Sequence, residues 1–287
     1  MNLILEKREL APQACLFVVK APRIARKARP GQFIILRPDE RGERIPLTIA
    51  DSNPERGTIT LVVQEVGKTT ARLGRMQKGE SILDLVGPLG QPSHLEKFGT
   101  VVCLGGGFGI AAIHPIAKAL RELGNWVISI IGARKKELLI MEEEMRLASS
   151  RLLIATDDGS YGRPGFVTDA FKDLLEEGIQ TDYCIAIGPV PMMRAVCKIT
   201  EPLEIKTVVS LNPIMVDGTG MCGACRVTVG GKTRFACVDG PDFDGHQVNW
   251  DELVKRQGIY LEAEKLAMEM FLHPEGACHR RGEGDAH

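Results

Sequence analysis

Three cysteines crowd into one short, glycine-rich segment and could bind a metal. Cys222, Cys225 and Cys237 form the pattern C-x2-C-x11-C, and Asp217 lies five positions before the first of them. Three thiolates and one carboxylate at this spacing favour a [2Fe-2S] centre with one oxygen ligand, because the glycines let backbone amides approach inorganic sulfide. Since a carboxylate donates less charge to ferric iron than a thiolate does, we predict a raised reduction potential.

Zinc is the alternative metal for the same segment. Zn²⁺ bound by three cysteines and one aspartate or histidine fits the residue types, and His246 lies near enough in sequence to compete with Asp217 as fourth ligand. Buried thiols that bind no metal are a further alternative. The remaining cysteines are scattered and indicate no site: Cys15, Cys103, Cys184, Cys197 and Cys278.

Two motifs in the N-terminal part could bind a flavin nucleotide. Arg44 opens the pentapeptide RIPLT, where a guanidinium can clamp a pyrophosphate and Thr48 can hydrogen-bond the flavin ring. Alone, this motif would equally fit a surface arginine that begins an ordinary strand. Gly67 then starts a turn, GKTT, whose backbone amides could contact phosphate together with the Thr70 hydroxyl. The two motifs together predict FAD binding.

A glycine-rich stretch after the strand pattern VVCL could bind a dinucleotide. It reads G-x-G-x-G at Gly105, Gly107 and Gly109 and not the fingerprint G-x-G-x-x-G, so a tight strand-to-helix turn is the alternative. Ligands bind at the carboxyl ends of strands in open α/β sheets. We therefore expect one crevice to collect the residues that follow later strand patterns, which are Arg134, Asp157, Asp158, Gly188 and Pro189. Three nearby residues are interpreted as structural: His114, Met192 and Met193.

The elements that must position these motifs predict a β barrel plus α/β fold. Residues 1–98 contain short β-type runs, typical of an antiparallel FAD-binding barrel: ACLFVVKA, GQFIILRP, IPLTIAD, TITLVVQEV and ESILDLVGPLG. Residues 99–206 alternate strand and helix patterns, which predicts a doubly wound parallel NAD(P)-binding domain. Residues 207–249 form a small [2Fe-2S] module. Residues 250–287 predict a helix interrupted at Gly258 and a disordered tail.

Composition argues against nucleic-acid and membrane partners. Lys and Arg number 36 against 37 Asp and Glu, so no broad basic field exists. No apolar run approaches the roughly 20 residues of a membrane helix, and the N-terminus lacks an apolar signal region. We expect a cytoplasmic protein.

Taken together, several motifs resemble the ferredoxin-NADP reductase superfamily, in its branch of two-subunit electron-transfer flavoproteins: RIPLT, VGKTT, GGGFGIAAIHPIA, TDDGSYGRPGFVT, IGPVPMM and DGTGMCGACRV. The resemblance spans residues 1–245. Within the branch, the chain is similar to the electron-transfer subunit of type B dihydroorotate dehydrogenase. It is more similar to the small subunit of NADH-dependent reduced ferredoxin:NADP⁺ oxidoreductase, the sulfide dehydrogenase subunit beta type. That family has Asp at the position of Asp217, where the dihydroorotate dehydrogenase subunits have Cys, and the extra C-terminal helix supports the same choice.

The resemblance implies cofactor contacts residue by residue. Thr69 departs from the usual second glycine of its turn. The implied FAD contacts are Arg44, Pro46, Leu47, Thr48, Val63, Gly67, Thr69 and Thr70. The implied NAD(H) contacts are Gly106, Gly107, Gly109, Arg134, Asp157, Asp158, Gly188 and Pro189. The implied cluster ligands are Asp217, Cys222, Cys225 and Cys237.

The resemblance also implies a heterodimer. A larger subunit would carry a second FAD and [4Fe-4S] centres, and ferredoxin would act through the complex. Hydride would pass between NADH and FAD, then single electrons through the cluster, with no side chain acting as acid or base. The alternatives are a relay subunit for dihydroorotate oxidation and a non-catalytic protein that uses the fold without flavin. The run Arg134-Lys135-Lys136 could favour a 2′-phosphate by charge, or could begin a solvated helix.

Overall fold

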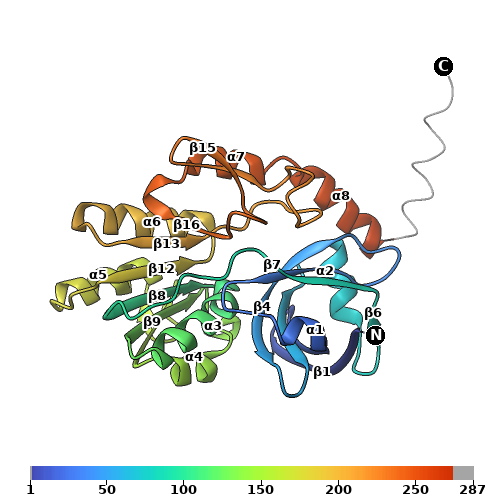
Figure 1. Ribbon diagram of the computed structural model, residues 1–287, viewed down its shortest axis with the longest axis horizontal. Coiled ribbons are helices and arrows are strands. Elements are labelled where there is room, and N and C mark those ends of the chain that lie inside the picture. Colours follow the sequence, from blue (N-terminus) through green and yellow to red (C-terminus); the bar gives the residue numbers. More distant parts are fainter. Residues whose placement is uncertain (1, 274–287) are drawn as a thin grey trace.

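The computed structural model describes residues 2–273, which form a barrel, an α/β sheet and a C-terminal module (Figure 1). Cys278 and the predicted tail beyond His273 lie outside the described residues. Among the described residues, no helix combines the length and apolar character needed to cross a bilayer.

Seven antiparallel strands build the predicted barrel in the spatial order β6-β1-β2-β5-β4-β3-β7. Side chains alternate between its two faces, and one face fills a core around Phe17, Ile34 and Leu61. Two short helices join strands, α1 (Pro22–Ala25) and α2 (Lys68–Arg75). The strands are β1 (Asn2–Ala11), β2 (Ala14–Lys20), β3 (Phe33–Arg37), β4 (Ile45–Asn53), β5 (Thr58–Gln64), β6 (Ser81–Ile82) and β7 (Asp84–Leu89).

The second sheet confirms the predicted doubly wound domain. Its order is β11-β10-β9-β8-β12-β13-β16, and only β16 pairs antiparallel. The chain moves outward in one direction through β9 and in the other through β12, so the topological switch point lies between β8 and β12. The strands are β8 (Thr100–Gly106), β9 (Trp126–Ala133), β10 (Arg151–Thr156), β11 (Arg163–Pro164), β12 (Tyr183–Ile187), β13 (Thr207–Ser210) and β16 (Asp242–Asp244).

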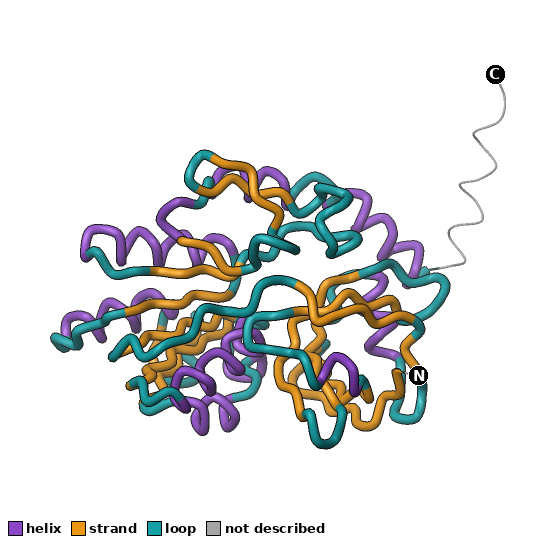
Figure 2. Tube along the Cα trace, viewed as in Figure 1, coloured by secondary structure: helices purple, strands orange, loops and turns teal. Residues whose placement is uncertain are grey.

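Helices cover both faces of this sheet (Figures 1 and 2). One face packs on α3 (Gly109–Glu122) and α4 (Glu142–Ala148), and the other on α5 (Val167–Glu176) and α6 (Val190–Thr200). Because both faces are buried, β8, β9 and β12 are nearly continuous apolar runs. Single turns of 3-10 helix are η1 (Lys136–Leu138), η2 (Glu201–Leu203) and η3 (Gly245–Gln247).

The C-terminal module differs from its predicted limits. The boundary placed after residue 206 falls directly before β13, and both β13 and β16 extend the second sheet. The sequence pattern assigned these short strands to the module because they flank its glycine-rich segment. Within residues 211–241, the module contributes the hairpin of β14 (Arg226–Val229) and β15 (Lys232–Phe235).

Two helices end the described chain, and the predicted interruption at Gly258 is confirmed. Asn249 caps α7 (Trp250–Gln257) by accepting a 3.1 Å hydrogen bond from the Glu252 amide. Gly258 ends α7, and α8 (Leu261–Leu272) follows. The helix α7 packs on β14 and α6, whereas α8 reaches the barrel at α2 (Figure 1).

Side chains and backbone from all three parts meet in shared contacts. Phe33 and Ile35 of β3 belong to the same buried cluster as Cys225 and Cys237. The predicted structural role of His114 is confirmed, since its buried ring lies 3.1 Å from the Ala50 carbonyl and joins α3 to β4. The three parts therefore hold one another in place.

Candidate functional site

The four predicted metal ligands form two pairs. The Cys222 thiol donates to Asp217 Oδ1 at 3.2 Å, and the Cys225 and Cys237 sulfurs are also 3.2 Å apart. In a [2Fe-2S] cluster each iron takes two protein ligands, whereas one zinc ion needs its four donors around a single point. Nowhere in residues 2–273 do three or more His, Cys, Asp or Glu side chains gather in that way. The donor set fits a [2Fe-2S] cluster.

His246 does not take part in this ligand set. Its Nε2 lies 2.9 Å from Thr200 Oγ1, at the end of α6, and its backbone amide donates to Asp244. The alternative of His246 as fourth ligand was therefore wrong. Proximity in sequence misled, because the chain between Cys237 and His246 passes through β16 and joins the second sheet.

Local hydrogen bonds orient the Asp217 carboxylate. Thr219 donates from its hydroxyl at 2.8 Å and from its amide at 3.3 Å, and the Met221 amide donates at 3.2 Å. These bonds, led by the Thr219 hydroxyl and followed by the Cys222 thiol, lower the pKa of Asp217 to about 2. The side chain is therefore anionic, as its predicted role as a ligand requires.

The second ligand pair is buried. Cys225 and Cys237 are each 2% exposed. Burial, and next the hydrogen bond with Cys225, raises the pKa of the Cys237 thiol to about 12. A thiolate at this position needs a neighbouring cation, which ferric iron would supply.

The cluster loop packs directly on the barrel. Gly218 has a φ of +76°, and a Cβ added there would lie 2.6 Å from Ile35 Cγ1 and 2.9 Å from Leu89 Cδ1. Glycine is thus required both by backbone conformation and by space. Ile35 is the cross-strand partner of Pro46 in the RIPLT motif. The residue after Asp217 therefore touches the strand next to the predicted flavin strand.

The two predicted FAD motifs meet in space. The Glu43 amide donates a 3.1 Å hydrogen bond to Thr69 Oγ1, which places Arg44 beside the start of α2. Arg44 is exposed and makes no ion pair or side-chain hydrogen bond within the described part of the chain. An unengaged guanidinium next to the first amides of a helix fits a diphosphate.

Alternation along β4 decides which RIPLT side chains can face a flavin. Pro46 and Thr48 pair with Ile35 and Phe33, which face the other two parts of the molecule. Leu47 packs against the barrel core instead, and the predicted contact Val63 is fully buried in that core. Leu47 and Val63 could therefore contact a cofactor only through their backbone atoms.

The Thr70 hydroxyl has a different role from the expected phosphate contact. It accepts hydrogen bonds from the amides of Val66 at 3.1 Å and Gly67 at 3.0 Å, so it caps α2. The Thr69 hydroxyl is likewise engaged by Glu43. Anion binding at this turn is left to the backbone amides.

The glycines predicted to line the nucleotide crevice lie together at the switch point. A Cβ on Gly109 would collide with the Ile187 carbonyl, and one on Gly188 would lie 3.1 Å from the Gly106 oxygen. Met192 lies over both Gly106 and Gly188, which makes it part of the crevice and not only core. The neighbouring Met193 is fully buried, as interpreted. Pro189 begins α6 at the same edge, and Gly107, with a φ of +54°, leaves open space.

The predicted polar strand ends also lie together. The Asp158 amide donates to the Arg134 carbonyl at 3.2 Å, and the Asp157 amide to Ala133 at 3.1 Å. Hydrogen bonds from Ser160, first from its side chain and then from its amide, lower the pKa of Asp158. Lys135 pairs with Glu137 at 2.5 Å.

Cations and carboxylates at this corner balance. Lys135 is paired with Glu137 and also acts on Asp158, and Lys136 lies 4.9 Å from the centre of the Tyr161 ring. Charge alone therefore does not favour a 2′-phosphate here.

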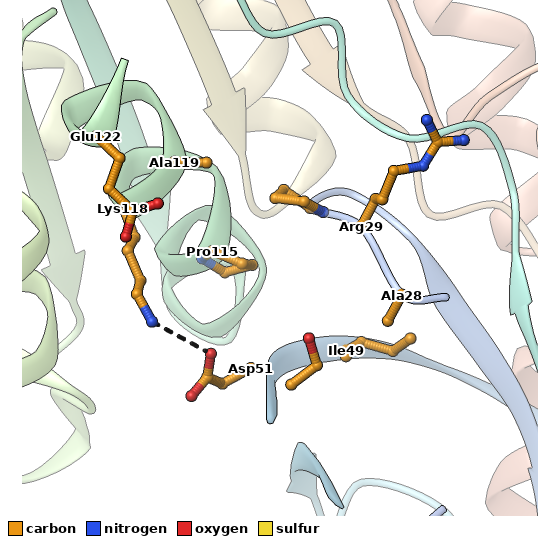
Figure 3. Close-up of a pocket in the computed structure, with 10 residues that line it drawn as sticks. Ala28, Arg29, Ile49, Asp51, Pro115, Lys118, Ala119 and Glu122 are labelled. Atoms are coloured by element: carbon orange, nitrogen blue, oxygen red, sulfur yellow. Dashed lines mark ion pairs between the residues drawn. The ribbon is translucent and has the colours of Figure 1, made fainter. Parts of the chain in front are cut away.

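A separate pocket of about 190 Å³ opens between the barrel and α3. Figure 3 shows Arg29 and Ile49 on one side and Pro115 on the other, with Lys118 paired to Asp51 at 3.7 Å. None of the predicted cofactor residues lines it.

Sequence reasoning missed the residues that join the sites. Ile35, Leu89 and Met192 shape the contacts of Gly218 and of the crevice glycines. Apolar residues in strands and helices give no local signal for such a role.

The barrel carries a turn whose backbone amides can bind an anion, glycines line the switch point of the second sheet, and the cysteine loop presents its donors in two pairs. Together these features define an FAD- and [2Fe-2S]-dependent oxidoreductase subunit of the ferredoxin-NADP reductase superfamily. Residues 212–249 match the family model of the iron-sulfur cluster binding domain of dihydroorotate dehydrogenase B. A dihydroorotate dehydrogenase B (NAD(+)) electron transfer subunit homolog of Thermotoga maritima is 51% identical, covering 96% of this chain and 97% of the relative. The electron transfer subunit of Shouchella clausii is 33% identical over 84% of this chain and 94% of its own.

The chain belongs to the family of dihydroorotate dehydrogenase B electron-transfer subunits and their homologues. A solved chain of NADH-dependent reduced ferredoxin-NADP oxidoreductase, studied for flavin-based electron bifurcation, is 49% identical with a TM-score of 0.90, covering 95% of this chain and 98% of that one. A cytochrome P450 reductase from Amycolatopsis shares the fold at 23% identity and a TM-score of 0.60, over 71% of this chain and 66% of that one. These matches confirm the resemblance inferred from the motifs.

Proposed function

We propose that this chain is the electron-transfer subunit of a flavin-based electron-bifurcating NADH-dependent reduced ferredoxin:NADP⁺ oxidoreductase. It pairs with a larger subunit that carries a second flavin and [4Fe-4S] centres, and ferredoxin reacts through the complex. The observation that supports this most is the packing of Gly218, next to the ligand Asp217, on Ile35 beside the flavin motif. Electrons can therefore pass from the flavin to the cluster through the neighbouring loop.

Each part of the chain has one task in this proposal. In the barrel, residues 1–98, Arg44 and the amides at Gly67 hold the FAD diphosphate, while Pro46 and Thr48 face the ring. In residues 99–206, the glycines of the crevice admit NAD(H), and Asp157 and Asp158 border it. Within residues 207–249, the segment 211–241 holds the cluster, and α7 and α8 extend the module.

When bound, FAD exchanges hydride with NAD(H), and the [2Fe-2S] cluster transfers single electrons. The protein's own residues bind and orient. Arg44 neutralises the diphosphate, the crevice glycines let the nucleotide approach the backbone, and Met192 limits water at Gly106 and Gly188. No side chain has to act as acid or base. A cytoplasmic location fits, because reducing conditions keep ligand cysteines as thiols.

The second candidate is the electron-transfer subunit of a type B dihydroorotate dehydrogenase. The name of the 51% identical relative favours it. Asp217 in the first ligand position favours the bifurcating enzyme. Coverage does not separate the two candidates, since the dihydroorotate dehydrogenase B subunit homolog covers 96% of this chain and the bifurcating enzyme's chain covers 95%.

Cofactor analysis of the purified full-length chain tests the proposal. We expect about two irons, two sulfides and one FAD per chain, with a rhombic EPR signal at low temperature after NADH or dithionite. Zinc in place of iron, or a colourless protein, would overturn it. With the partner subunit bound, NADP⁺ reduction that needs both NADH and reduced ferredoxin supports bifurcation, whereas NADH formation from dihydroorotate supports the second candidate.

A further inference from the structure

The C-terminal helix α8 is tied to the barrel through one aromatic ring. Phe271 lies with its ring centre 4.3 Å from the Arg75 guanidinium and 5.7 Å from that of Arg72, both on α2. No side chain of α8 is fully buried, and the ring of Phe271 is half-buried. Figure 1 shows α8 reaching from the C-terminal module to the barrel, where it contacts α2.

Arg72 also contacts the loop between β3 and β4 (residues 38–44). Its guanidinium lies 2.9 Å from Asp39 Oδ2, and its Nε donates to the same oxygen at 3.0 Å. The other oxygen of Asp39 accepts the Arg41 amide at 2.8 Å. The beginning of the loop is therefore fixed from α2.

The end of the same loop is also fixed from α2. The Glu43 amide donates to Thr69 Oγ1 at 3.1 Å, and the Glu43 carboxylate lies 3.5 Å from Lys68 Nζ. Arg44 is the next residue. Its position thus depends on both anchors of the loop, and the Asp39 anchor depends on where Arg72 is held.

Two arginines three positions apart on one helix face repel each other. An aromatic ring beside both guanidiniums offsets that repulsion by cation–π attraction and limits their rotamers. Within residues 2–273, Arg75 has no carboxylate partner, so the Phe271 ring is the contact that neighbours its guanidinium, while Arg72 pairs with Asp39.

We propose that Phe271 is a positioning residue for FAD: through Arg72 and Asp39, α8 fixes the loop that presents Arg44 to the FAD diphosphate. This inference rests on the proposed function, because it takes Arg44 as a diphosphate ligand. The C-terminal helix thereby couples the flavin site to the module that it extends.

Titration of the full-length apoprotein with FAD, followed by flavin fluorescence, tests the inference. Phe271→Leu keeps apolar volume but removes the π face, and should weaken FAD binding by about two- to fivefold. Phe271→Trp keeps the face and should bind like wild type. Leu266→Ala, an exposed position on the same helix, is the matched control and should also bind like wild type.

The Leu and Trp variants separate positioning from packing. Equal losses in both, or no loss in either, would overturn the inference. Asp39→Asn should weaken binding as Phe271→Leu does, and the double variant should lose no more than the worse single variant, because both break one chain of contacts. Additive losses would contradict the path through Asp39.

Arg44→Ala distinguishes this inference from the proposed function. If wild type binds no FAD, or if Arg44→Ala binds as tightly as wild type, the flavin site itself is wrong. If Arg44→Ala loses affinity while Phe271→Leu does not, only the role of Phe271 is wrong.

Discussion

The nucleotide crevice and the cluster loop are both rich in glycine, but glycine has a different role in each. In the crevice, Gly109 is required because a side chain would collide with the Ile187 carbonyl, whereas a Cβ on Gly106 would meet the flexible end of Met192. In the loop, Gly220 and Gly223 have φ values of +87° and +68°, and a Cβ on Gly223 would meet only Phe235, at 3.7 Å. Backbone packing thus requires glycine at Gly109, whereas positive-φ turns require it at Gly220 and Gly223. Gly218, where the loop meets the barrel, is required for both reasons.

Removing a buried ligand should have the largest effect, which is loss of the cluster. This effect should be confined to the loop. Cys237→Ser is expected to lose nearly all iron and acid-labile sulfide, because serine cannot replace a buried thiolate of the cluster. FAD content should stay near wild type. Chemical analysis of the purified chain gives both numbers, and Cys15→Ser, in the barrel core, is the control that should keep its iron. A Cys237→Ser protein with full iron would contradict the ligand assignment.

A side chain added in the crevice should have the second-largest effect. Gly109→Ala places a methyl group against the Ile187 carbonyl, so we expect a loss of about 1–3 kcal/mol in the free energy of unfolding. Flavin reduction by NADH should also be largely lost. Urea unfolding and stopped-flow reduction measure the two effects.

Gly107 is the matched control for this prediction. It has a φ of +54° with nothing within 4 Å of an added Cβ, and asparagine tolerates that conformation. Gly107→Asn should cost less than about 1 kcal/mol. If the two variants lose stability equally, space is not what requires glycine in the crevice.

Changing the first ligand should alter the cluster without removing it. Asp217→Cys should retain iron but lower the midpoint potential, on the order of 100 mV, because a thiolate donates more charge to ferric iron than a carboxylate. A redox titration followed by EPR measures the shift. An unchanged potential would show that Asp217 does not bind iron.

The smallest effect is expected where only backbone conformation requires glycine. Gly223→Ala should cost about 1 kcal/mol of stability, and Gly223→Asn less, because asparagine is the more tolerant of positive φ. Chemical unfolding of the full chain compares them. If Gly223→Asn were the less stable of the two, space would limit position 223 as it limits Gly218.

Sequence patterns predicted most of the fold but missed elements with weak local signals. The first strand, β1, was not among the predicted runs, since charges from Glu6 to Glu9 obscure its alternation. The short strands β13 and β16 were assigned to the cluster module, although they complete the second sheet. Both errors have one cause: such segments become strands through pairing with distant partners, and their own composition does not indicate it.

Thr70 and His246 show the same limit for side chains. Both are polar residues near a motif, and proximity suggested a ligand role for each. In the structure the Thr70 hydroxyl caps α2, and the His246 ring is hydrogen-bonded to Thr200. Hydrogen-bonding capacity is visible in a sequence, but the partner that uses it is not.

Three features can be read from the amino-acid sequence alone: the glycine turns, the alternation of strand and helix, and the types and spacing of the donors Asp217, Cys222, Cys225 and Cys237. These depend on chemistry within a few neighbouring residues. The folded chain was needed to show that the donors form two pairs, that Gly218 packs on Ile35, and that Phe271 contacts Arg72. Such contacts join residues far apart in the chain, and only the packing of the barrel, sheet and module brings them together.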